Sequence, residues 1–151
     1  MITDTLRTLF IRDLNRLYKE VSSYTTEGNL WKIDHEITNS GGNLALHLVG
    51  NLNSFISDEI GGSGYVRERD KEFNLKDVPI VELLKMIEDT KDGVDTALEH
   101  MDPKLLEKEY PILVFKEPQT YQHFLMHLAT HLTYHLGQIN YHRRLMDNAI
   151  L

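Results

Sequence analysis

The sequence predicts an all-α protein, a four-helix bundle with long crossover connections. Four segments place apolar residues at three- and four-residue steps, the spacing of an amphipathic helix, and no segment alternates convincingly with the period of two that marks a strand. The predicted helices are residues 3–24, 43–60, 79–101 and 119–147. Long connectors at 61–79 and 102–118 separate the last three helices, which is typical of bundles whose chain crosses from one end to the other.

Residues that start and stop helices bound the first two segments. Thr3 or Asp4 is the expected N-terminal cap of the first helix, and Ser40 and Asn43 are the cap candidates of the second. Gly61-Gly62 follows the second helix and accepts the left-handed conformation found at helix ends.

The third helix begins at Pro79, a residue well suited to a first turn. Before the fourth helix, the apolar piece 111-PILVF-115 is either a short strand or an extended segment packed on the bundle. The fourth helix is the longest, and Gly137 is its only helix-weakening residue. With no internal repeat and no low-complexity tract, we expect one domain over residues 1–151.

Composition limits the function classes. The formal net charge of −7 argues against a nucleic-acid partner, which would usually meet a basic patch. The chain has no cysteine, so any metal must be held by His, Asp, Glu or backbone oxygen, and any reacting thiol must come from another molecule. Residues 1–17 lack the apolar core of a signal peptide, and no run of about 18 apolar residues exists. We therefore expect a cytoplasmic protein that does not enter the membrane.

Histidines recur every four residues in the fourth helix, in 123-HFLMHLATHLTYHLGQINYHRR-144. A helix turns about 100° per residue, so a step of four residues advances a side chain by about 40°. With His131 at zero, the apolar residues lie between about 20° and 140°, and His135 falls inside that arc. His127 and His123 drift the other way, toward solvent. The periodicity therefore favours His131 and His135 as the inward pair, and His142 as a residue of a pocket or of the metal's surroundings.

A metal ion explains two inward histidines better than a plain core does, since each ring needs a partner and protonating it in the core is costly. The alternative is that they are hydrogen-bonded core or surface residues with no ligand. His47 borders the core face of the second helix and is the expected third ligand, with Asn51 as a candidate supporting group. His35 and His100 rank lower because they lie in a connector and at a helix end. Three imidazoles leave one position open and suit zinc, nickel or iron.

The segments 41-GGNLALHLVGN-51 and 131-HLTYHLGQINYHRR-144 resemble the metal-binding signatures of the DinB-like (DinB/YfiT) superfamily, and 67-RERDKEF-73 resembles one branch of it. The resemblance covers essentially the whole chain. It implies a bundle with an up-up-down-down-like crossover, and a divalent metal held by His47, His131 and His135. It also implies a homodimer, since relatives are often dimeric. Characterised relatives include transferases that use a low-molecular-weight thiol, and isomerases or hydrolases with related sites.

The leading functional hypothesis is a metal-dependent transferase that activates a small thiol for attack on an electrophile. Gln138 is the candidate catalytic residue, because it could orient a water at the metal, or else it makes a helix contact. Some arginines could anchor an acidic cosubstrate, although arginine in a charged loop or at a helix end is usually solvated. The arginines considered are Arg67, Arg69, Arg143 and Arg144.

Two alternatives remain open at this stage. A metal-dependent hydrolase would want a general base, and Asp58 and Glu59 lie about three turns from His47. A non-catalytic bundle that binds a metal or a ligand would also fit a bare three-histidine site. Tyr134 and Tyr141 face away from the inward pair and are expected to serve packing or an interface.

Overall fold

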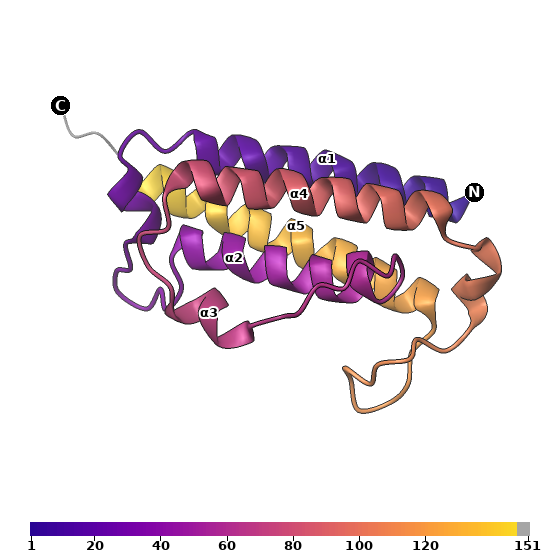
Figure 1. The fold of residues 1–151 in the computed structure, drawn as a ribbon. Helices are drawn as coiled ribbons and strands as arrows, with labels where there is room; N and C mark the ends of the chain where they lie inside the picture. Colours follow the sequence, from indigo (N-terminus) through magenta and orange to yellow (C-terminus); the bar gives the residue numbers. More distant parts are fainter. Residues whose placement is uncertain (148–151) are drawn as a thin grey trace.

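The computed structural model describes residues 1–147 and confirms the all-α prediction. Its long helices are α1 (Ile2–Ser22), α2 (Gly41–Leu52), α4 (Ile80–His100) and α5 (Tyr121–Met146), and they form the bundle (Figure 1). A π-helical turn, η2 (Asn53–Asp58), continues α2. The connectors contain a short helix, α3 (Arg69–Asn74), and the 3-10 turns η1 (Glu27–Trp31) and η3 (Pro103–Glu107). The predicted single domain extends to residue 151, and residues 148–151 lie outside the described part.

The helix ends show which local signals were informative. Ser40 caps α2 as predicted, with its Oγ accepting a hydrogen bond from the Asn43 backbone N–H at 3.1 Å. Thr3 and Asp4 were wrong as caps of α1, because that helix begins earlier and Met1 occupies the cap position. The Asp4 carboxylate instead accepts a hydrogen bond from the N-terminal ammonium group of Met1 at 3.1 Å. Gly62 has φ +69°, the left-handed conformation expected where the second predicted helix ends.

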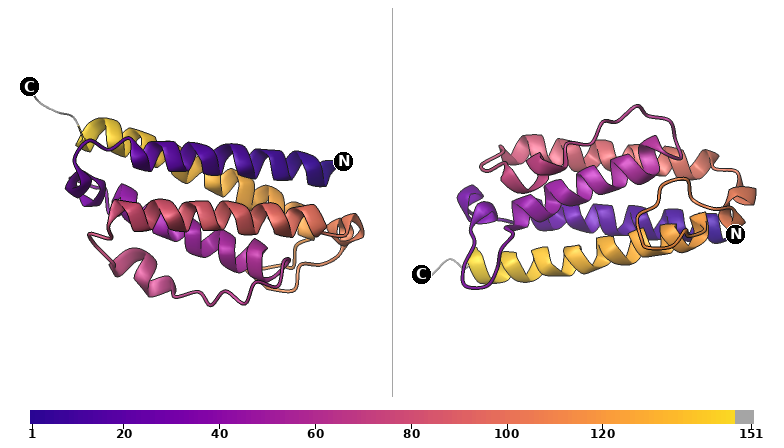
Figure 2. Two further views of the ribbon diagram at one scale, coloured as in Figure 1. Left: turned by 45° about the horizontal axis from the view of Figure 1, so that its top comes forward. Right: turned by 90° about the horizontal axis from the view of Figure 1, so that it is seen from below.

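Side-chain contacts fix the directions of three of the long helices, and Figure 1 shows that α2 runs antiparallel to α1. Arg7, near the start of α1, pairs with Asp95, near the end of α4, so these helices are antiparallel. Asn140 of α5 donates to Glu20 of α1 at 2.7 Å, and both lie near the ends of their helices, so α1 and α5 are parallel. The order along the chain is therefore up-down-down-up, which differs from the up-up-down-down-like order that the resemblance implied (Figure 2).

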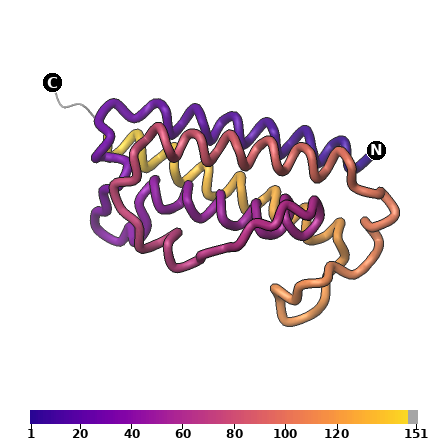
Figure 3. The backbone as a smooth tube through the Cα atoms, in the orientation of Figure 1, coloured from indigo at the N-terminus to yellow at the C-terminus, as the bar shows by residue number. Residues whose placement is uncertain are grey.

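Only one of the two long connectors crosses the bundle. Helices α2 and α4 are parallel, so residues 59–79 must return along the length of the molecule, and they carry α3 on this path (Figure 3). Residues 101–120 join the antiparallel pair α4 and α5 and stay at one end. Within this second connector, residues 111–115 form no strand, and the described chain contains only an isolated bridge between Glu109 and Thr120.

Helix α2 is the most enclosed element of the bundle, because every one of its residues is buried. It packs against α4 and α5, and α3 covers it from the side of the crossover (Figure 1). A polar side chain on α2 therefore needs a partner inside the molecule. None of the helices in residues 1–147 is long and apolar enough to cross a membrane.

Candidate metal centre

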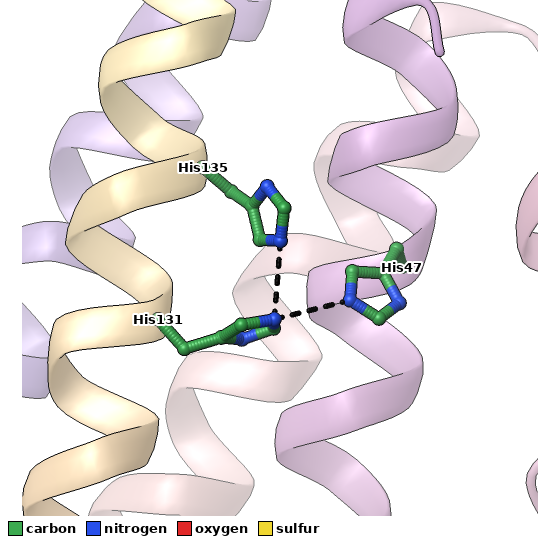
Figure 4. Close-up of side chains that lie close together, drawn as sticks. All are labelled: His47, His131 and His135. Atoms are coloured by element: carbon green, nitrogen blue, oxygen red, sulfur yellow. Dashed lines mark hydrogen bonds between the residues drawn. The ribbon is translucent and has the colours of Figure 1, made fainter. Parts of the chain in front are cut away.

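Three imidazole rings meet between α2 and α5. His47 comes from α2, and His131 and His135 lie one turn apart on α5 (Figure 4). The Nε2 atom of His131 lies 3.3 Å from Nε2 of His47 and 3.1 Å from Nε2 of His135. The rings are nearly perpendicular to one another, with interplanar angles of 79°, 90° and 89°. Three nitrogens bound to one tetrahedral cation lie about 3.3–3.4 Å apart. These two distances are close to that value, and all three candidate ligand atoms lie within 4.8 Å of one another, as a shared metal ion requires.

A carboxylate that the sequence analysis missed holds His47 in place. Glu72, in α3, accepts a hydrogen bond from His47 Nδ1 through its Oε1 atom at 3.0 Å. Arg67 donates to the same carboxylate from two nitrogens, at 2.8 and 2.9 Å. The side chains of His47, Glu72 and Arg67 expose only 10%, 6% and 14% of their surface, so this is an enclosed network. A signal was present in 67-RERDKEF-73, although the six-residue helix is too short to show a periodicity.

The path of α3 and the surface of α2 together make room for this carboxylate. The Asn43 side-chain amide of α2 donates to the backbone oxygens of Glu72 and Leu75, at 3.0 and 2.8 Å, which fastens α3 to α2. Gly50 leaves the space that the Glu72 side chain fills, since a Cβ atom at that position would overlap the carboxylate. A glycine inside a helix lowers the stability of the protein by about 0.5–1 kcal/mol relative to alanine. Here a glycine is needed because a larger side chain would displace Glu72.

His135 has its own oxygen partner. Its Nδ1 atom lies 2.7 Å from Oε1 of Gln138, one turn further along α5. The oxygens of Glu72 and Gln138 accept hydrogen bonds, so the Nδ1 atoms of His47 and His135 carry the protons. The Nε2 lone pairs of both rings therefore point toward Nε2 of His131. In metal-binding proteins, a hydrogen bond to the non-ligating ring nitrogen fixes the tautomer of a ligating histidine in the same way.

Burial favours the neutral form of two of the three imidazoles, His131 and His135. Burial, together with the neighbouring His135 and His47, lowers the pKa of His131 to about 4. Burial also lowers the pKa of His135, although the hydrogen bond with Gln138 opposes that shift. For Glu72, burial alone would raise the pKa, but the hydrogen bonds from Arg67 and His47 outweigh it and hold the pKa below its ordinary value. The site thus combines an ionised carboxylate behind His47 with two imidazoles, His131 and His135, whose neutral form is favoured.

A core of hydrogen-bonded histidines does not account for this geometry. A neutral ring has one N–H, so His131 Nε2 can donate to His47 or to His135, and not to both. The other nitrogen of His131, Nδ1, is buried and has no hydrogen-bond partner within residues 1–147. A cation that accepts all three lone pairs removes the conflict. The three residues are also the only group of metal-binding type found in the described chain.

The remaining histidines take other roles. His123 is exposed, as expected, but His127 is half-buried against Phe115, with ring centroids 4.8 Å apart, so its predicted drift to solvent is only partial. His142 is a buried core residue that accepts from Tyr24 Oη at 2.6 Å and donates to the Lys32 carbonyl at 2.8 Å. It also lines the cleft described below. His35 and His100 are exposed, away from the metal centre.

Two of the four arginines considered as anchors are paired with carboxylates. The Arg67 guanidinium is occupied by Glu72, and Arg143 is paired with Glu20 at 2.7 Å. Arg69 is exposed on α3. Arg144 is exposed and lies over the Tyr141 ring, 5.2 Å from its centroid.

Beside His135, a cleft of about 550 Å³ opens between α5 and the loop that precedes α2. Small-molecule sites usually have volumes of about 300–1,000 Å³. The cleft is lined by His135 and Gln138, so it adjoins the histidine group. The arrangement offers a cation position with three nitrogen donors and a neighbouring space large enough for a small organic molecule.

Comparison with known proteins places the chain in a family. Residues 4–150 match the model of a family described as a protein of unknown function, DUF1572, and the chain belongs to that family. No curated protein and no solved structure matches it.

Proposed function

We propose that this DUF1572 chain is a divalent-metal-dependent transferase that activates a low-molecular-weight thiol for attack on an electrophile. The observation that carries the proposal is the convergence of three Nε2 atoms from His47, His131 and His135. No fourth protein ligand joins them within residues 1–147, and three imidazoles with an open position are the arrangement of catalytic zinc sites. Zinc, nickel and iron all suit these donors, and such a cation lowers the pKa of a thiol or water that binds it.

The state of Glu72 favours a thiol over water as the nucleophile. Metal-assisted hydrolysis is faster with a base that removes a proton from the attacking water. Glu72 is the carboxylate next to the histidines, and both its oxygens are occupied by His47 and Arg67. Its pKa is held below the ordinary value by those hydrogen bonds, which makes it a weak base. A thiol loses its proton far more readily than water does, so it needs no such base.

The proposed reaction needs neither an oxidant nor a reductant. The sulfur of the thiol forms a bond to an electrophilic carbon, the bond from that carbon to its leaving group breaks, and the leaving group departs with the thiol proton. Within the chain, Glu72 and Gln138 hold two imidazoles in the tautomer that presents Nε2. The absence of cysteine means that no protein thiol competes for the electrophile.

The resemblance to the DinB-like superfamily supports the same proposal. Its two signatures fall on the helices that bring the histidines together, with His47 on α2 and the other two ligands on α5. Those relatives include thiol-dependent transferases, so the superfamily uses such sites for the proposed chemistry. A homodimer stays an expectation drawn from the same resemblance.

Metal analysis of protein purified without a histidine tag is the first test. We expect one equivalent of zinc, nickel or iron in the wild type, a loss in His131→Ala, and no change in His123→Ala, which removes an exposed histidine from the same helix. A wild type without stoichiometric metal refutes the metal centre.

Turnover is the second test. We expect at least one of several small thiols to react with monochlorobimane faster in the presence of the wild type than with His131→Ala. Bound metal without turnover for any thiol would refute the transferase and favour a non-catalytic metal-binding protein or a hydrolase.

A further inference from the structure

The cleft beside His135 has walls of a distinct chemical character. Its α5 lining includes the polar residues His135, Gln138 and His142, and the loop before α2 adds Glu36, Thr38 and Asn39. The apolar and aromatic part of the lining consists of Ile37, Leu44, Tyr134, Tyr141 and Leu145. The loop that closes the cleft passes beside the C-terminal half of α5 (Figure 2).

The two tyrosines of the lining are largely exposed. Tyr134 and Tyr141 expose 65% and 64% of their surface, and Leu145, one turn beyond Tyr141, exposes 66%. They therefore contribute little to the core. Tyrosine and leucine on the rim of a cleft provide flat, apolar surface that a bound ring can cover, and aromatic pairs gain about 0.5–1.5 kcal/mol beyond the buried area.

Charge in the cleft is sparse and negative. Glu36 is the one ionisable acid among the lining residues, and the lining contains neither lysine nor arginine. Arg144 lies over the Tyr141 ring but is not part of the lining, and the guanidinium of Arg143 is bound to Glu20. An anionic ligand would leave water without gaining a side-chain cation from the lining, and burying an unpaired charge is costly.

We propose that this cleft binds the electrophile, and that the electrophile presents an uncharged, planar aromatic group to it. The proposal rests on the proposed transferase function. The apolar lining residues accept the ring, Tyr134 and Tyr141 pack against it, and the polar groups of His135 and Gln138 place the reacting end beside the three histidines. The acidic or sugar-like part of a thiol cosubstrate finds no matching cation among the lining residues and lies outside this cleft.

A matched pair of fluorescent probes tests the binding without any turnover. N-phenyl-1-naphthylamine is neutral, and 1-anilinonaphthalene-8-sulfonate has the same aromatic skeleton with an added sulfonate. In metal-free protein, we expect the neutral probe to bind the wild type at least about tenfold more tightly, because the sulfonate gains no side-chain cation and meets Glu36.

Variants at exposed positions locate the probe. Tyr141→Ala should weaken the neutral probe about tenfold, and Glu36→Lys should narrow the difference between the probes. Leu113→Ser removes an apolar side chain that is 64% exposed in the connector before α5 and should leave binding unchanged. Three outcomes would overturn the proposal. The two probes could bind equally well, or the protein could prefer the anionic probe and lose that preference in Arg144→Gln. The third is that Leu113→Ser weakens binding as much as Tyr141→Ala does.

Kinetics distinguish this proposal from the transferase function itself. In an active preparation, the neutral probe should raise the KM for the electrophile and leave the KM for the thiol unchanged. A rise in the KM for the thiol alone would show that the cleft belongs to the thiol and would overturn the assignment. Missing metal or missing turnover would instead refute the proposed function, and it would not change the probe measurements.

Discussion

Replacing Glu72 by Gln tests how far the metal centre depends on the carboxylate behind it. The substitution keeps the size of the side chain but removes its charge and turns one acceptor into a donor. Glu72 makes three short hydrogen bonds, one to His47 and two to Arg67. A glutamine cannot satisfy all three, because its NH2 group meets an N–H of one of them. The hydrogen bond that fixes the tautomer of His47 is then weakened.

The expected magnitude follows from these contacts. Loss of a partner behind a ligating histidine typically weakens metal binding 10–100-fold, or about 1.4–2.7 kcal/mol. Breaking a fully buried ion pair costs about 3–5 kcal/mol, and Arg67 keeps 14% of its surface exposed, so we expect the metal-free protein to lose about 2–3 kcal/mol. For a chain of this size, that loss lowers Tm by roughly 4–12 °C.

Two measurements separate the effects. Competition with a chromophoric chelator gives the metal affinity, and thermal unfolding in excess chelator gives the stability of the metal-free protein. Glu68→Gln is the matched control, since Glu68 pairs with Lys71 in the same segment while 61% of its side chain is exposed, and such pairs contribute little. A Glu72→Gln variant that binds metal within twofold of the wild type would refute the role assigned to the carboxylate.

Three further predictions follow from the site and its helices. Metal-free protein should lose stability as pH falls from about 6.5 toward 4, because the folded state depresses the pKa of His131 to about 4 and so binds fewer protons than the unfolded chain. In urea titrations, the free energy of unfolding should depend less on pH in His131→Gln than in the wild type. Gly50→Ala should destabilise the protein and weaken metal binding, whereas Gly137→Ala, where a Cβ atom meets nothing within 4 Å, should stabilise it by about 0.5–1 kcal/mol in the same urea assay. Gln138→Ala should weaken metal binding about tenfold if it acts through its histidine contact, and a fall in kcat with unchanged metal affinity would show that it acts on the substrate instead.

The sequence predicted the histidine group because helical phase is a local property. The 3.6-residue period separates His131 and His135 from His123, which is exposed in the structure. The same argument placed His47 at the border of the core face, and its ring does meet the other two. For these three histidines, helical phase and position along the helix were enough to predict that the rings come together.

The carboxylate behind His47 was not predictable in this way. Its position depends on how residues 59–79 return along the bundle, and that path follows from the parallel arrangement of α2 and α4. Neither the six residues of α3 nor the charges of the connector specify that arrangement. The up-down-down-up order was likewise missed, because amphipathic periodicity gives the apolar face of each helix and no information on its direction. For the same reason Arg67 was taken for a solvated or substrate-binding residue.

The connectivity of the metal centre also implies an order of assembly during protein synthesis. His47 and Glu72 are 25 residues apart, so their pairing can begin once the first half of the chain has emerged. His47 and His131 are 84 residues apart, and their contact must wait for the last long helix. Emerging chains fold from the N-terminal side, at about 5–20 residues per second. Incomplete chains would lack the full set of nitrogen donors. A cation would therefore bind tightly only to chains in which α5 has already docked.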